Sequence, residues 1–138
     1  MTAPAPSLLA VCRFLRRHAP GIARAPGVKH LAHFVAWYWR DARVGIVHDA
    51  GRILAVALAR AIDDPAQGAQ PFAHTETGRY VWVQDIVSTD PRGVPLLLRH
   101  AIARFGPREA FIGTVFHRSG QLRMLPFALV QRFTSGAI

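Results

Sequence analysis

The first forty residues contain two segments in which apolar residues recur every three or four positions, the period of a helix with one buried face. The first segment runs from Ser7, a residue type favoured at helix N-caps, to about Arg17. The second runs from about Val28 to Trp39 and ends in three consecutive aromatic residues. Residues 1–6 hold two prolines and are expected to form a flexible leader. The sequence therefore predicts two N-terminal helices.

After these helices the apolar residues alternate with polar ones or form short continuous runs, which are the two patterns of strands. Arg43–His48 and Arg52–Ile62 flank Asp49-Ala50-Gly51, and a glycine in so short a turn supplies the positive φ of a tight hairpin. Three more strands are predicted further along the chain: Tyr80–Val87, Ala110–Phe116 and Gln121–Leu125.

The segments between these strands complete the predicted fold. Pro95–Phe105 is expected to be a helix, because a proline is tolerated in the first turn and Gly106-Pro107 ends the pattern. Asp63–Glu76 is rich in turn-forming residues and is predicted to be a surface loop, and Phe127–Phe133 is either a strand or a short helix. The strand–helix–strand crossover after a hairpin predicts an α+β fold, with a mixed, mostly antiparallel sheet flanked by helices in a single domain over residues 1–138.

The composition is that of a globular domain, since 51% of the 138 residues are hydrophobic and 18% are charged. No apolar run approaches the ~20 residues that span a bilayer. The apolar stretch Ser7–Cys12 is too short for a secretory signal, and the arginines follow it rather than precede it. Cys12, the single cysteine, has no partner for an internal disulfide. These features favour a reducing, cytoplasmic location.

The charge balance is strongly basic, with 17 Lys and Arg against 8 Asp and Glu, a net charge of +9. All but one of the basic residues are arginines, whose planar fork pairs with phosphate and carboxylate groups. An acidic partner is therefore expected, although a GC-rich genome explains the arginines equally well. Arg13, Arg16 and Arg17 gather on the first helix, either as a solvated face or, with Phe14, as a contact for a membrane surface or nucleic acid.

The segment from Val81 to Ile102 carries the residues from which a site could be built. A turn with Arg92-Gly93 at its tip joins a strand to a helix N-terminus, where backbone N–H groups converge on anions. Asp85 is the one acid in this apolar strand, and it is either a catalytic group or a structural partner of an arginine. His117 follows the next strand and is expected to face the same crevice, as a base or as a hydrogen-bonded rim residue.

The order of elements is similar to that of the GCN5-related N-acetyltransferase (GNAT) superfamily. In that superfamily a loop after a strand holds the pyrophosphate of the acyl donor, and residues 87–94 resemble it. The resemblance implies an acyl-CoA donor held by Val87, Arg92, Gly93 and Val94. The second glycine of that loop is absent here and Pro95 follows, which slightly favours an acidic acyl carrier protein as the donor.

Residues 30–125 also resemble, more distantly, the branch of the superfamily that acylates RTX toxins on lysine. Ala36-Trp37-Tyr38-Trp39 is similar to a helix end in that branch, and Trp82–Val87 is similar to the strand that carries its catalytic aspartate. The resemblance implies a catalytic role for Asp85. The histidine of that branch has no counterpart just after Trp39, and His33, with His30 and His48 as alternatives, could take its place.

The sequence thus predicts an acyltransferase-like protein that moves an acyl group from a thioester donor to an amine, with Asp85, His117 and His33 as catalytic residues. The alternative is a catalytically inactive basic module that binds nucleic acid or an acidic protein. No metal is expected, because His30 and His33 share a helix face without further ligands nearby. The usual GNAT fold has further strands after this point, so the sheet is expected to be shortened, and a second copy in a homodimer could complete it.

Overall fold

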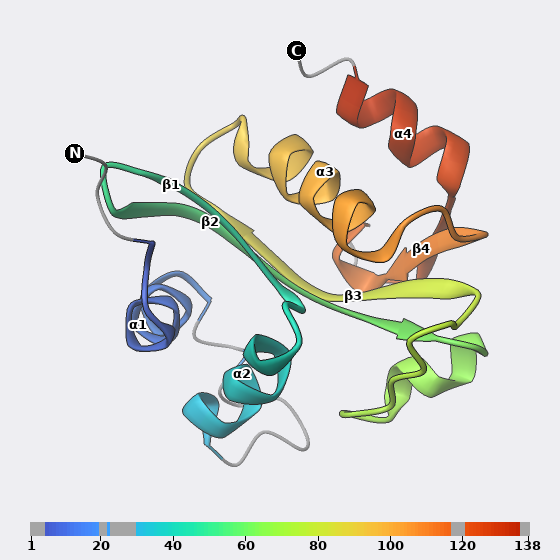
Figure 1. The fold of residues 1–138 in the computed structure, drawn as a ribbon, viewed down its shortest axis with the longest axis horizontal. Coiled ribbons are helices and arrows are strands. Elements are labelled where there is room, and N and C mark those ends of the chain that lie inside the picture. The colour runs from blue at the N-terminus through green and yellow to red at the C-terminus, as the bar shows by residue number, and fades with distance from the viewer. Residues whose placement is uncertain (1–4, 20–21, 23–29, 117–120, 136–138) are drawn as a thin grey trace.

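The computed structural model describes residues 5–19, 22, 30–116 and 121–135. A five-stranded sheet in the order β1-β2-β3-β4-β5 forms the middle layer (Figure 1). Helices α1 (Leu8–His18) and α2 (Leu31–Arg40) cover one face, and α3 (Gly93–Phe105) and α4 (Phe127–Ser135) cover the other. The strands are β1 (Val44–Asp49), β2 (Arg52–Ile62), β3 (Tyr80–Ser88), β4 (Ala110–Gly113) and β5 (Arg123–Pro126). The predicted α+β class is confirmed.

The N-terminal layer follows the helical pattern of the sequence. Ser7 caps α1, and its hydroxyl accepts a hydrogen bond from the N–H of Ala10 at 3.2 Å. Helix α2 starts at Leu31, and the predicted residues just before His30 lie outside the described part of the chain. The buried faces of the two helices pack together on the sheet, and the buried residues are Val11, Cys12, Phe14 and Leu15 in α1 and Leu31, Phe34, Val35 and Tyr38 in α2. None of the helices within the described residues is long and apolar enough to cross a membrane.

The predicted β1–β2 hairpin is confirmed, but its turn is shorter than the predicted Asp49-Ala50-Gly51, because Asp49 still pairs with Arg52. The two turn residues, Ala50 and Gly51, both have positive φ values, of 52° and 80°. The register of this pair shifts between Val47 and His48. The next pair, β2 and β3, is also antiparallel and contains a bulge. Leu58 pairs with Asp85 and Ala59 pairs with Val83, so Gln84 is an extra residue in β3. Because of this extra residue, Val83 and Val87 point to opposite faces of the sheet, although they are an even number of positions apart.

The crossover through α3 makes β3 and β4 parallel, as expected. Their pairing is limited to three residues, Tyr80–Trp82 against Ala110–Ile112. The predicted strand to Phe116 was too long, because the chain leaves the sheet at Gly113 and forms a 3-10 turn, η3 (Thr114–Phe116). Gly113 is in close contact with β3 at this point, where an added Cβ would lie 2.7 Å from the carbonyl oxygen of Val83.

Three other elements sharpen or correct the sequence predictions. Helix α3 starts at Gly93, two residues before Pro95, because the first turn does not need the missing N–H of proline. The tail adopts the helical alternative, α4. The Asp63–Glu76 segment contains a 3-10 helix, η2 (Pro65–Ala69), and is held against β2 by the fully buried Arg60.

Candidate functional site

The sheet opens between β3 and β4. After Trp82 no strand among the described residues pairs with β3 on the β4 side, although β3 continues to Ser88. Backbone groups on an unpaired strand edge remain available for hydrogen bonds to a ligand. We refer to this unpaired stretch, residues 83–88 of β3 beyond its pairing with β4, as the opening between β3 and β4.

Asp85 lies on the α1–α2 face beside this opening. Val87, two residues further along β3, packs with the core of α1 and α2, whereas the intervening Ile86 packs with the core under α3. The Asp85 side chain is largely buried, and this burial raises the pKa of its carboxyl group from 3.8 to about 6. It makes no hydrogen bond or ion pair with any residue that the structure describes. The structure thus gives Asp85 no arginine partner within those residues, and its carboxyl group is left available for chemistry.

Tyr38 of α2 is a polar residue whose hydroxyl group is influenced by the charge of Asp85. Its side chain is fully buried, and its hydroxyl accepts a hydrogen bond from Nε of Arg60 at 3.3 Å. Burial raises the pKa of Tyr38, Arg60 opposes this rise, and the negative charge of Asp85 adds to it. Neither Tyr38 nor Arg60 was singled out from the sequence as part of a site. A lone arginine within the apolar run of β2 was the signal that could have found Arg60.

Gln84, the extra residue of the bulge, accepts a hydrogen bond from Nε1 of Trp82 at 3.0 Å. This contact fixes the side chain that comes just before Asp85 in the chain. Bulges often redirect a side chain next to a site, and here the bulge and this hydrogen bond set the position of Asp85. Alternation of residues in the sequence does not reveal it.

The turn between β3 and α3 is organised by Asp90. Its carboxylate accepts the backbone N–H of Arg92 at 2.8 Å and pairs with the Arg92 guanidinium through hydrogen bonds of 3.1 and 2.9 Å. These hydrogen bonds lower the pKa of Asp90 to about 2. The carbonyl of Asp90 accepts the N–H of Gly93 at 2.9 Å. The amides of Arg92 and Gly93 thus have partners inside the turn, and the N–H of Val94 has none within the described residues.

Gly93 is fixed in this turn by close packing. An added Cβ would collide with the hydroxyl oxygen of Ser88 and lie 2.8 Å from Cβ of Ala55. The Ser88 hydroxyl in turn donates to the carbonyl of Asp90 at 2.6 Å. The absence of a side chain therefore brings the start of α3 against the end of β3, which places the Val94 amide next to the opening.

An apolar cavity of about 390 Å³ continues from this turn on the α3–α4 face. Val94 and Leu98 of α3, Phe116 of η3 and Phe133 of α4 are among the residues that line it. Arg123 is the one charged residue among those that line it. A cavity of this size and character accommodates a flexible, mostly apolar chain.

The structure does not bring either predicted catalytic histidine, His33 or His117, into the site among the residues that it describes. His33 is exposed on α2, where its ring lies 5.5 Å from that of His30. His117 lies outside the described residues, so its predicted role is not tested. Within the part of the chain that the structure describes, no three His, Cys, Asp or Glu side chains gather as metal ligands.

This arrangement of helices and strands defines a GNAT-like fold. A solved structure with this fold, the GphF GNAT-like decarboxylase in complex with isobutyryl-CoA, matches the chain with a TM-score of 0.51 and 22% sequence identity. The match covers 76% of this chain and 59% of that chain, so the protein spans less than two thirds of the length of this neighbour. No family model and no curated protein matches the sequence.

Proposed function

We propose that this protein binds an acyl-CoA thioester in the opening between β3 and β4 and acts on its acyl group there. The observation that carries the proposal is the parallel pair that ends after Trp82, with the N-terminus of α3 on one face and the unpartnered Asp85 on the other. The GNAT-like fold supports it, as does the isobutyryl-CoA bound by the structural neighbour.

The donor would enter from the α3–α4 face. Its phosphates would contact the Arg92 guanidinium and the Val94 amide, and Gly93 would keep the backbone close to them. The pantetheine arm would occupy the apolar cavity and hydrogen-bond to the free edge of β3 near Val87. Asp90 already pairs with Arg92, so the donor must share or displace this ion pair. An acyl carrier protein, which offers the same arm on an acidic surface, is the alternative donor that the net charge of +9 favours.

The leading reaction is acyl transfer to an amine. The amine nitrogen would attack the thioester carbonyl, a C–N bond would form, and the C–S bond would break to release the thiol. Asp85, with a pKa of about 6, is ionised at neutral pH and can take the proton that the amine loses. Backbone N–H groups of β3 at the opening would stabilise the negative oxygen. The resemblance of Trp82–Val87 to the toxin-activating acyltransferases supports the same role for Asp85. His117 and His33 stay as predictions for a second proton carrier.

A second candidate reaction is decarboxylation of a carboxyacyl thioester. The structural neighbour is a decarboxylase, and Asp85 has no cation beside it among the described residues. In this reaction the C–C bond to the carboxylate breaks, carbon dioxide leaves, and the resulting enolate takes a proton. Asp85 in its protonated form could supply that proton, since its raised pKa keeps part of it neutral near pH 6.

Native mass spectrometry with isobutyryl-CoA and acetyl-CoA tests donor binding directly. The wild-type protein should gain the mass of one donor, and Arg92→Glu should lose the complex. Arg40→Glu carries the same charge change at an exposed position on α2 and should retain it. A missing complex in the wild type, or equal complexes in the two variants, would refute this site.

The reaction is then read from the products. A lysine-containing peptide that gains the acyl mass indicates transfer, and carbon dioxide release from malonyl-CoA or methylmalonyl-CoA indicates decarboxylation. In either case Asp85→Asn should keep donor binding and lose turnover, because an amide side chain cannot take up or release a proton as a carboxyl group does. Unchanged turnover in Asp85→Asn would remove Asp85 from the mechanism.

A further inference from the structure

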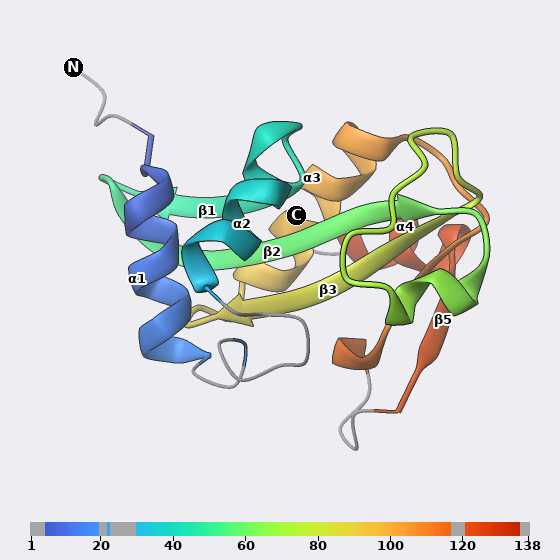
Figure 2. The ribbon, with the colours of Figure 1, turned by 90° about the horizontal axis from the view of Figure 1, so that it is seen from below.

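The loop between β2 and β3, residues 63–79, takes the place of a strand beside the last part of β2. Figure 2 shows this loop at the end of β2 that lies opposite the β1–β2 hairpin. Among the described residues, β1 pairs with β2 only as far as Leu58, and the carbonyl of Arg43 then accepts the N–H of Ala59 at 3.0 Å. Beyond this point the backbone groups of Ala61, on the same edge of β2, need partners from elsewhere.

The loop provides both partners of Ala61. The carbonyl of Ala61 accepts the N–H of Thr75 at 2.9 Å, as in a pair of strands. The N–H of Ala61, however, donates to Nδ1 of the His74 side chain at 3.0 Å, so an imidazole ring lies where a backbone carbonyl would normally lie. Among the residues that the structure describes, no other histidine ring accepts a hydrogen bond from the backbone.

This contact fixes the protonation state of His74. Because the N–H of Ala61 is a donor, Nδ1 carries no proton, and the neutral ring has its proton on Nε2. Nε2 lies 3.1 Å from Oε1 of Glu76 and donates to it. A second proton could be added only at Nδ1, where it would point at the N–H of Ala61. The charged form of His74 is therefore incompatible with its contact to β2.

The charged side chains around the ring come from the elements packed against it: Glu76 of the loop, Arg104 of α3, Arg43 just before β1, and Arg60 of β2, which donates to the carbonyl of Ala73. Helix α2 contributes an uncharged group, Trp37, whose ring centroid lies 6.1 Å from that of His74. Burial lowers the pKa of His74 below its usual value, Arg43 and Arg104 act in the same direction, and Glu76 opposes them. His74 is therefore neutral at pH 7 and gains its second proton only in acidic solution.

Glu76 keeps its charge through this range. Hydrogen bonds from Arg104, at 2.8 and 3.0 Å, and from His74 hold the pKa of Glu76 at about 2. Protonated His74 could therefore stay paired with Glu76, and Arg104 would still connect Glu76 to α3. The contact that protonation removes is the one between the loop and β2.

We propose that the contact between His74 and Ala61 is a pH-sensitive switch, which holds residues 73–75 of the loop against β2 at neutral pH and releases them in acid. The proton comes from solvent, since 13% of the His74 side chain is exposed. The same loop packs on β3. An added Cβ at Gly68 would collide with the Trp82 ring, and Nε1 of Trp82 donates to Gln84 in the bulge. Release of the loop would therefore change the packing beside the strand that carries the candidate site.

Nuclear magnetic resonance of the full chain, titrated from pH 7 to pH 4 without a donor, tests the switch. The nitrogen shifts of His74 should show an unprotonated Nδ1 at pH 7. Protection of the Ala61 amide against hydrogen exchange, corrected for the intrinsic effect of pH, should fall at least about tenfold as the ring becomes charged. The amide of Val56, in the middle of β2, should keep its protection, which excludes general unfolding. A proton on Nδ1 at pH 7, or an Ala61 amide that stays protected when His74 is charged, would overturn the proposal.

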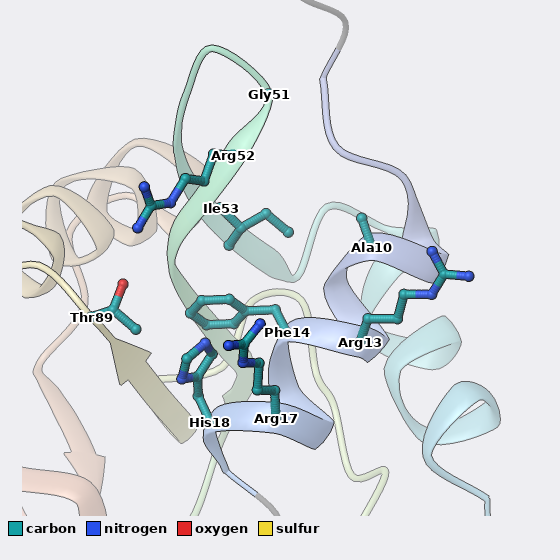
Figure 3. Close-up of a pocket in the computed structure, with 9 residues that line it drawn as sticks. All are labelled: Ala10, Arg13, Phe14, Arg17, His18, Gly51, Arg52, Ile53 and Thr89. Carbon is teal, nitrogen blue, oxygen red and sulfur yellow. The ribbon is translucent and has the colours of Figure 1, made fainter.

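His74→Asn is the matched variant, because its side-chain oxygen can accept the N–H of Ala61 but does not titrate. Protection of the Ala61 amide in this variant should change less than about twofold over the same pH range. His18→Asn is the control. It removes an exposed histidine of α1 whose ring lies 4.6 Å from that of Phe14 (Figure 3), and it should keep the wild-type transition. A transition that persists in His74→Asn, or is lost in His18→Asn, would overturn the proposal. Since no donor is used, this result is independent of the proposed function.

Discussion

The Asp85 carboxyl group should make the stability of the protein depend on pH in a direction opposite to that of most acidic residues. Its pKa is raised by burial, from 3.8 to about 6, so the folded state binds a proton more tightly than the unfolded state. Stability from this proton is present at low pH and is lost as the pH rises through about 6. Asp85→Asn removes the ionisation and should remove this dependence.

The magnitude follows from the two pKa values. With 3.8 in the unfolded state and about 6 in the folded state, protonation at pH 5 favours the folded state about tenfold. This corresponds to about 1.4 kcal/mol relative to pH 8, where both states are ionised. Solvent screening at the part of the carboxyl group that stays exposed makes this figure an upper limit.

Urea unfolding of the wild type and of Asp85→Asn at pH 5 and pH 8 measures the effect. The difference in unfolding free energy between the two proteins should shift by up to about 1.4 kcal/mol, with the variant relatively more stable at pH 8. Because the two proteins share every other titratable group, the contributions of those groups should cancel in this difference. A difference that stays constant between the two pH values would refute the buried, unpartnered state of Asp85.

Three further predictions concern the turn, the buried arginine and the first helix cap. Asp90→Asn should tighten acyl-CoA binding several-fold in calorimetry, because Arg92 loses its competing carboxylate, and it should have no such effect in an Arg92→Gln background. Arg60→Met should lower the unfolding free energy by about 3–5 kcal/mol, because three loop carbonyls lose their donor. Limited proteolysis should then cut within residues 63–76, and a loop that stays resistant would contradict this role. Ser7→Ala should cost about 1 kcal/mol in urea unfolding, whereas Ser7→Asp should cost little.

Local patterns were enough to predict most of the fold. The predicted first helix and hairpin match α1, β1 and β2 closely, because a Ser cap, a helical stripe and a glycine turn are each encoded within a few residues. The parallel crossover also followed from the order of elements. The end of β4 could not be predicted in this way. The strand ends at Gly113, which packs closely against Val83, a residue that is distant in sequence.

The candidate site was predicted only in outline. Asp85 stood out as an acid in an apolar strand, and its surroundings bear out that it is buried. The bulge at Gln84 depends on the register between two strands, which residue type does not show. The pairing of Asp90 with Arg92 depends on how the turn folds. Asp63–Glu76 was predicted to be a loop, but only its path beside β2 shows that His74 bonds to Ala61.

Hydrogen–deuterium exchange with isobutyryl-CoA would decide whether the donor binds between β3 and β4, because it reports where a ligand lies along the backbone. We expect slower exchange in residues 83–88 of β3 and at the first turn of α3, where free amides would bond to the donor. Exchange in the β1–β2 pairing should not change. Binding without protection of β3, or protection confined to other strands, would contradict a thioester site in the β3–β4 opening.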